Sequence, residues 1–225
     1  MLDVETVTQH SELLGRQKVH DERSRAYALG AAVDRSTWRD RRIRLYEPIP
    51  NPNQWVGACT GVAKCSQLNA VGNRRKGRVL NMLDAERLYS RSTEIDPWVG
   101  TWPPDDTGSS ALASCKAAAE FGLATREYRW LFGGADEVVQ AVMEGKVISV
   151  GTWWHFDMFN RDFPLLHVSG GVAGGHQYVI RGYNKDNDWV LGRCWWGEYQ
   201  DFWLRREDLD MLLRDGGDAH WQATA

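Results

Sequence analysis

Cys59 has the setting in which a thiol gains most as a nucleophile. It directly follows Gly57 and Ala58 and begins a stretch, residues 59–71, whose apolar side chains recur at helical spacing. A thiol at a helix N-terminus is exposed to the positive end of the helix dipole, which lowers its pKa. Because the thiolate is the attacking form, Cys59 is a candidate for covalent catalysis. The competing interpretation is a small buried structural thiol, as most free cysteines are.

A candidate base for this thiol lies in the second half of the chain. Of the six histidines, His176 stands out because it follows the glycine-rich residues 170–175 and opens an alternating strand, residues 176–183. Glycines allow a substrate or another backbone to come close to the imidazole. Upstream of Cys59, Gln54 carries a side-chain amide that would donate to a developing oxyanion, beside the backbone N–H of Cys59.

The composition excludes several other classes of function. The net charge is −3, so the chain has no basic excess with which to hold a nucleic-acid backbone. Its four cysteines form no C-x-x-C pair, so we expect no metal, no disulfide framework and no cofactor. No run approaches the ~18 apolar residues of a membrane span, and residues 1–16 lack the apolar core of a signal peptide. We therefore expect a cytoplasmic protein, a monomer, with no membrane partner.

The elements that must position these residues change type along the chain. Helical spacing predicts helices first, and alternating or β-branched runs predict strands afterwards, which is the segregated pattern of an α+β fold with two lobes. We divide the chain into an arm, residues 1–40, and one domain, residues 41–225, with a helical lobe at about 55–145 and a β lobe at about 146–225. The predicted helices are residues 59–71, 80–91, 111–121 and 136–144, the strands are 146–154, 176–183, 189–196 and 199–204, and a helical turn spans 207–214.

Four motifs, which occur along the chain in the order that the family has, resemble those of the papain-like cysteine peptidases. Residues 54–61 (QWVGACTG) resemble the entry of that family's central helix, and residues 174–183 (GGHQYVIRGY) resemble its Gly-His-Ala-Val-x-x-x-Gly-Tyr strand. Residues 127–130 would be its Glu-x-x-Tyr-Pro-Tyr turn, and residues 137–145 resemble the step into its second lobe. The resemblance extends from about residue 40 to about residue 215 and is greatest to the simpler bacterial and phage-type members.

The resemblance implies a fold and a mechanism. The fold would have a helical N-terminal lobe and an antiparallel β-sheet or barrel as its C-terminal lobe, with the active-site cleft between them. Cys59 and His176 would form a thiolate–imidazolium pair that hydrolyses a peptide or protein substrate through an acyl-enzyme, with Gln54 at the oxyanion and no cofactor. The implied substrate-binding residues are Gly108 and Ser109 on one wall, Gly174 and Gly175 on the other, and Trp196 over the pair.

The chain departs from the family at the third catalytic position. The family places an asparagine before Ser-Trp-Gly, and here the matching block puts Cys194 in that position. A thiol is a poor hydrogen-bond acceptor, so the orientation of His176 must come from elsewhere. The main alternative is therefore a catalytically weak or inactive module that binds a peptide or a cell-wall fragment. A second alternative uses the same pair on peptidoglycan cross-bridges. The arm is short and lacks an evident pair of amphipathic helices, so we expect no large pro-segment.

Overall fold

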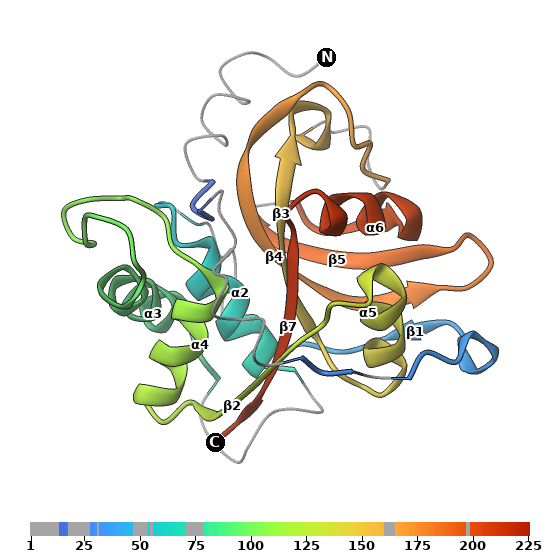
Figure 1. The fold of residues 1–225 in the computed structure, drawn as a ribbon, viewed down its shortest axis with the longest axis horizontal. Coiled ribbons are helices and arrows are strands. Elements are labelled where there is room, and N and C mark those ends of the chain that lie inside the picture. The colour runs from blue at the N-terminus through green and yellow to red at the C-terminus, as the bar shows by residue number, and fades with distance from the viewer. Residues whose placement is uncertain are drawn as a thin grey trace.

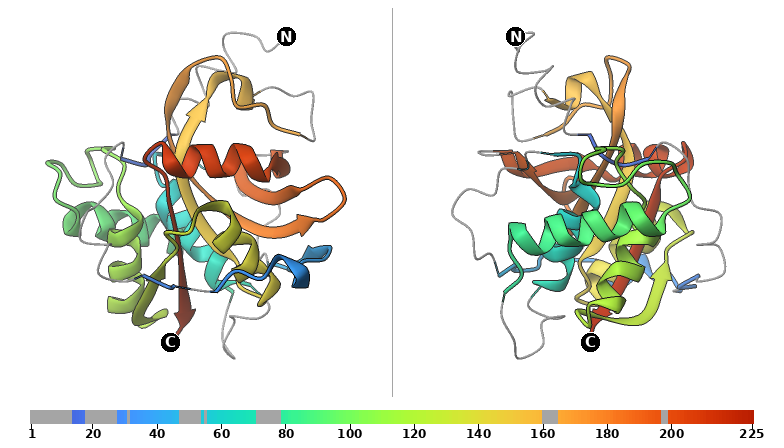
Figure 2. Two further views of the ribbon diagram at one scale, coloured as in Figure 1. Left: turned by 45° about the vertical axis from the view of Figure 1, so that its right-hand side comes forward. Right: turned by 90° about the vertical axis from the view of Figure 1, so that its left-hand side faces the viewer.

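The helical part of the molecule consists of three helices that pack on one another (Figures 1 and 2). The computed structural model describes residues 14–17, 28–30, 32–46, 54, 56–70, 79–159, 165–196 and 199–225. Asn81 begins α3 with a capping box, and Ser110 caps α4 by accepting from the N–H of Ala113. The helices are α2 (Cys59–Leu68), α3 (Met82–Ile95) and α4 (Ala111–Glu120), and α2 also packs against the sheet.

An antiparallel sheet forms the other part of the molecule. Its strand order is β2-β7-β3-β4-β5-β6, and the short strand β1 pairs with β4. Helices come first in the chain and most strands follow, which confirms the predicted α+β arrangement. The strands are β1 (Arg41–Arg42), β2 (Ala124–Trp130), β3 (Ile148–His155), β4 (Val172–Asn184), β5 (Trp189–Trp196), β6 (Tyr199–Arg205) and β7 (Asp218–Thr224).

Besides the two-residue β1, two longer strands were not expected from the sequence. Residues 127–130, expected as a turn, belong to β2, which pairs with β7 through Trp130 and His220. The prediction of a turn is wrong because Tyr128 and Trp130 alternate with charged residues and both are buried. The sequence pattern of β7 predicts a strand only weakly, since its buried residues include small or polar side chains such as Ala219 and Gln222.

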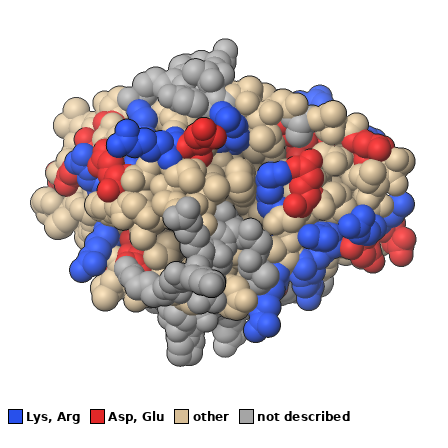
Figure 3. Space-filling model, turned by 90° about the horizontal axis from the view of Figure 1, so that it is seen from below, with Lys and Arg blue, Asp and Glu red and all other residues tan. Residues whose placement is uncertain are grey.

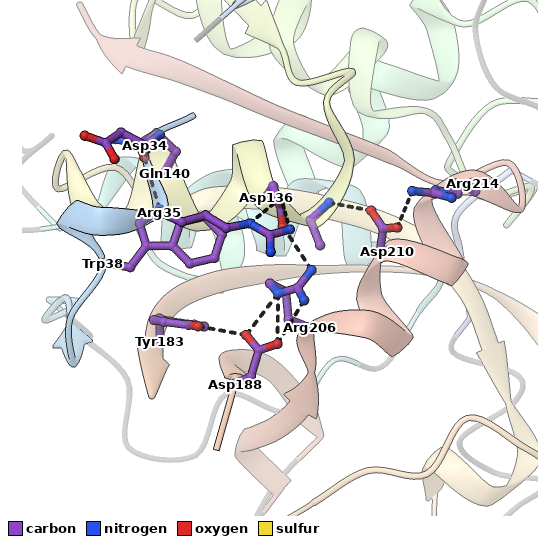
Figure 4. Close-up of polar contacts among 11 residues, drawn as sticks. Asp34, Arg35, Trp38, Asp136, Gln140, Tyr183, Asp188, Arg206, Asp210 and Arg214 are labelled. Carbon is purple, nitrogen blue, oxygen red and sulfur yellow. Dashed lines mark hydrogen bonds and ion pairs between the residues drawn. The ribbon is translucent and has the colours of Figure 1, made fainter. Parts of the chain in front are cut away.

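Residues 34–42 are bound to the sheet and to the helix α5 (Gly134–Met143), which packs against α6 (Arg206–Arg214) (Figure 4). Trp38 is buried edge-on against Tyr183, with ring centroids 5.5 Å apart, and its Nε1 donates to Gln140 Oε1 at 3.1 Å. Arg206 holds the two helices to the sheet by ion pairs with Asp136 and Asp188, each at 2.9 Å. Two 3₁₀ turns, η2 (Arg35–Thr37) and η3 (Phe156–Phe159), complete the described elements.

The surface carries both signs of charge. Basic and acidic side chains are interspersed over the face seen in Figure 3, in keeping with a net charge of −3. Among the residues that the structure describes, no helix combines the length and the apolar character needed to cross a membrane.

A lysine lies in the interior where α2 meets α4 and β7. Lys64 has no exposed surface, and its Nζ donates to Gln67 Oε1 at 2.9 Å and to Cys115 Sγ at 3.2 Å. The same Nζ lies 3.1 Å from Nε2 of His220. Burial lowers the pKa of Lys64 below its ordinary value and lowers that of His220 as well. These hydrogen bonds fix the packing of α2, the helix that carries Cys59.

The buried lysine is expected to make stability depend on alkaline pH. Because its pKa is lower in the folded chain, the unfolded chain binds one more proton between that pKa and the usual lysine value. The contribution of Lys64 to the free energy of unfolding therefore rises with pH, by about 1.4 kcal/mol per pH unit in that interval. Lys64→Met removes this dependence. Denaturant unfolding at a series of pH values from 7 up to the usual lysine pKa should show the difference between the two chains growing in favour of wild type, whereas parallel curves over the whole series would contradict the burial argument. Lys116→Met is the matched control on α4.

Candidate functional site

Cys59 is the first residue of α2, as the sequence predicted, and it is completely buried. Burial raises the pKa of its thiol to about 11, although the backbone amides of Gln177 and Gly15 and the charge of Arg16 act to lower it. The prediction that this pKa is lowered is therefore wrong for the structure described. The helix end is present, but the sulfur is shut away from water, and desolvation outweighs the favourable dipole.

His176 lies in β4, opposite Thr152 of β3, and it too is completely buried. Its ring is edge-on to Trp154 at 5.0 Å between centroids and stacked on Tyr178 at 6.2 Å. Burial lowers its pKa to about 3, so the imidazole is neutral. The backbone amide of Gln177, the residue after His176, faces the sulfur of Cys59 where α2 packs against β4.

Trp154 packs against the candidate histidine, a contact that the sequence analysis did not predict. Its ring packs against His176, Tyr178 and Phe202, and it is 1% exposed. The aromatic expected over the pair was Trp196, which lies in β5 but whose side chain is outside the described part of the structure. The alternation of β3 was the available signal: Trp154 is two residues from Thr152, which pairs with His176.

The two remaining predicted catalytic residues, Gln54 and Cys194, lie near the end of β5. The backbone N–H of Gln54 donates to the carbonyl of Trp195 at 3.2 Å, and its side-chain Nε2 donates to the carbonyl of Val56 at 2.8 Å. Cys194 is buried in the hydrophobic core, one residue beyond the pair between Arg193 and Val179. Gln54 is thus held beside the start of α2 by its own loop and by the sheet.

A short segment of the N-terminal arm, residues 14–17, crosses between the two walls of this site; we call it the strap. On the helical side, Ser109 donates to the carbonyl of Gly15 at 2.8 Å and accepts from the N–H of Gln17 at 3.0 Å. On the sheet side, the N–H of Arg16 donates to the carbonyl of Gly175 at 3.0 Å. The residues predicted to line a substrate groove therefore hold an extended backbone between them.

Glycines make this close approach of backbones feasible. A Cβ on Gly15 would overlap the carbonyl oxygen of Gly57, directly ahead of Cys59. A Cβ on Gly108, whose φ is +70°, would overlap the carbonyl of Gly15, and one on Gly175 would overlap that of Arg16. A cavity of about 270 Å³ remains beside the strap. It is lined by the strap, Gly57, residues 106–108 and residues 173–175.

The described residues hold neither a cluster of metal-ligating side chains nor a disulfide bond. No group of three or more His, Cys, Asp or Glu side chains among them is arranged to hold an ion. The four cysteines are free thiols.

The fold is that of the papain-like cysteine proteases. Xylellain, a cysteine protease from Xylella fastidiosa, superimposes with a TM-score of 0.70 at 14% identity over 95% of this chain and 97% of its own. The procathepsin B S9 of Trypanosoma congolense gives 0.66 at 11% identity, over 97% of this chain and 89% of its own. The stem bromelain precursor gives 0.61 at 14% identity, over 99% and 80%. No family model and no curated protein matches the sequence.

Proposed function

We propose that this protein is a cysteine peptidase in which Cys59 attacks the carbonyl of a peptide substrate and His176 transfers the proton. The observation that carries the proposal is the strap itself. An extended peptide backbone is bound on both sides, by Ser109 and by Gly175, directly over a thiol at the N-terminus of a helix. A cleft that binds backbone in this way, next to a potential nucleophile, is suited to cutting peptide bonds.

The proposed chemistry requires the strap to leave. Burial is the main cause of the raised Cys59 pKa and the lowered His176 pKa. Admitting water therefore lowers the pKa of Cys59 and raises that of His176, which favours a thiolate–imidazolium pair. The thiolate then attacks the carbonyl carbon. The N–H of Cys59 and the side-chain amide of Gln54 hold the oxyanion, and His176 protonates the leaving amine and then activates water to release the acyl group.

The same geometry explains how a strap made of peptide is bound without being cut. Gly15 presents its backbone N–H to the sulfur, while its carbonyl oxygen is held by the N–H of Ser109. The bond next to the thiol is therefore not polarised toward the proposed oxyanion site. We propose that the described arrangement is a latent form, and two of the structurally similar proteins are themselves a procathepsin and a bromelain precursor. Residues 14–17 would then act as an inhibitory segment.

A labelling experiment tests the assignment of the pair. The full-length Gly15→Leu chain, in which the added side chain cannot fit beside Gly57, is treated at about pH 6.5 with a peptidyl epoxysuccinyl probe. We expect a single rapid adduct on Cys59, and slow labelling after His176→Gln. Thermal unfolding of both chains checks that they are folded. Slow and equal labelling of all four cysteines would argue against an activated pair.

The alternative is a peptide-binding module that does not cleave. The observation in its favour is Cys194, which stands where a stronger acceptor would orient His176 and which lies in the hydrophobic core. Rapid labelling of Cys59 together with hydrolysis of casein or of cell-wall cross-bridge peptides would exclude it. Hydrolysis of the cross-bridge peptides but not of casein would favour the peptidoglycan interpretation, and the reverse would exclude it.

A further inference from the structure

The side chain of Arg16 leaves the strap and enters a pocket in the sheet, formed by Gly151, Gln177, Gly216 and Asp218; we call it the arginine pocket. Its Nη2 donates to Asp218 Oδ2 at 2.9 Å and to the carbonyl of Gly216 at 3.1 Å. The side chains of Arg16 and Asp218 are only 2% and 6% exposed. An ion pair so enclosed is a charge-assisted contact of high selectivity rather than a surface pair.

The pocket is built to the shape of a long basic side chain. Gly151 of β3 pairs with Asp218 of β7, and a Cβ on Gly151 would overlap Nε of Arg16 and lie 2.6 Å from its Cδ. The absence of a side chain at this one position in β3 therefore opens the path to the carboxylate. Gln177 borders the same space, with its Oε1 2.5 Å from that Cβ position while its Nε2 donates to Ser149 at 2.9 Å.

The pocket lies one residue away from the thiol. Gly15 faces the sulfur of Cys59, and Arg16 is the next residue of the strap. When the strap leaves, Asp218 loses its guanidinium, and a side chain of the same chemistry from a bound peptide takes the same place. The strap presents the N–H of Gly15 to the sulfur, where a cleaved substrate presents a carbonyl, so a substrate lies in the opposite chain direction to the strap. We propose that the enzyme selects peptide substrates with an arginine immediately before the residue whose carbonyl meets Cys59. This rests on the proposed function, and the strap is then a substrate-like competitor for the same pocket.

Kinetics on matched substrates test the selection. The full-length Gly15→Leu chain is assayed with acyl-Arg-Ala-aminomethylcoumarin and with the same compound carrying citrulline or leucine in place of arginine. Citrulline keeps the shape and lacks the charge. We expect kcat/KM to be about 100-fold higher for arginine than for citrulline, because a buried carboxylate discriminates strongly against a neutral isostere. In Asp218→Asn the ratio should fall to within a few-fold of one. Equal rates on all three substrates, with hydrolysis proceeding, would overturn the inference and leave the peptidase proposal standing.

A binding measurement tests the pocket without catalysis. In the full-length Arg16→Ala chain the pocket is emptied of its own side chain, and N-acetylarginine amide should raise the midpoint of thermal unfolding by several degrees at millimolar concentration. N-acetylcitrulline amide should raise it much less. Gly151→Val in the same chain should abolish the shift by filling the pocket, and Arg126→Ala, an exposed arginine on β2, is the matched control for Arg16→Ala. Equal shifts with both compounds, or none with either, would overturn the inference. If the arginine compound alone raises the midpoint but the epoxysuccinyl probe labels no cysteine rapidly, the arginine pocket stands and the peptidase proposal fails.

Discussion

Replacing Cys59 by alanine in the strap-displaced Gly15→Leu chain is expected to abolish peptide hydrolysis, with kcat/KM falling by about 10⁵-fold or more. The loss is this large because neither His176 nor the oxyanion donors can replace a covalent nucleophile. Removing a single buried sulfur atom from the start of α2 should cost only about 1 kcal/mol of stability, so the chain remains folded. The measurement is release of coumarin from the arginine substrate, with the unfolding midpoint as the check on folding.

Cys65 gives the matched control for this substitution. It lies on the same helix, is 5% exposed and belongs to the hydrophobic core, so Cys65→Ala makes a similar loss of volume away from the cleft. We expect this variant to keep most of its activity. If the Cys59→Ala chain retained full hydrolysis, or if both variants lost it equally, the nucleophile would have to be sought elsewhere.

The sequence predicted those features that local chemistry determines. The start of α2 at Cys59 was expected, because apolar side chains recur at helical spacing from that residue onward. His176 in an alternating strand was expected from the local pattern as well, whereas the glycines on both walls were expected from the family resemblance. β2 and β7 were missed because their buried faces depend on pairing between segments far apart in the chain, such as Trp130 with His220 and Ser149 with His220.

What the sequence did not predict depends on contacts between distant segments. Residues 14–17 carry no periodic pattern, and nothing local indicates that Arg16 reaches Asp218, 202 positions later. The pKa of Cys59 has the same origin. The helix end predicts a lowered value, but the strap excludes water from the sulfur, and burial raises it to about 11. The positions of the site residues follow from sequence motifs. The protonation state of Cys59 is set by residues 14–17, which carry no motif.

Displacing the strap is expected to change both the rate and the pH profile of thiol alkylation. In wild type, Cys59 with a pKa of about 11 and His176 with one of about 3 are both neutral between roughly pH 4 and 10. Alkylation of Cys59 by iodoacetamide should therefore be slow at neutral pH and rise about tenfold per pH unit toward pH 11. In Gly15→Leu an ion pair should form, and the rate should be nearly independent of pH above about pH 6.

The size of the difference follows from two opposing effects. At pH 6.5, a thiol with a pKa of about 11 is ionised to about 3 parts in 10⁵, whereas a paired thiolate is almost fully ionised. The more acidic thiolate is a weaker nucleophile, with a Brønsted coefficient of about 0.45, which returns about two to three of these decades. We therefore expect Gly15→Leu to react about 100-fold faster than wild type at pH 6.5, measured by mass spectrometry of the Cys59 peptide. Arg126→Leu, which adds an exposed leucine on β2, should react like wild type. A wild-type chain that already reacts as fast as Gly15→Leu, with the same flat profile, would mean that the strap does not control the thiol in solution.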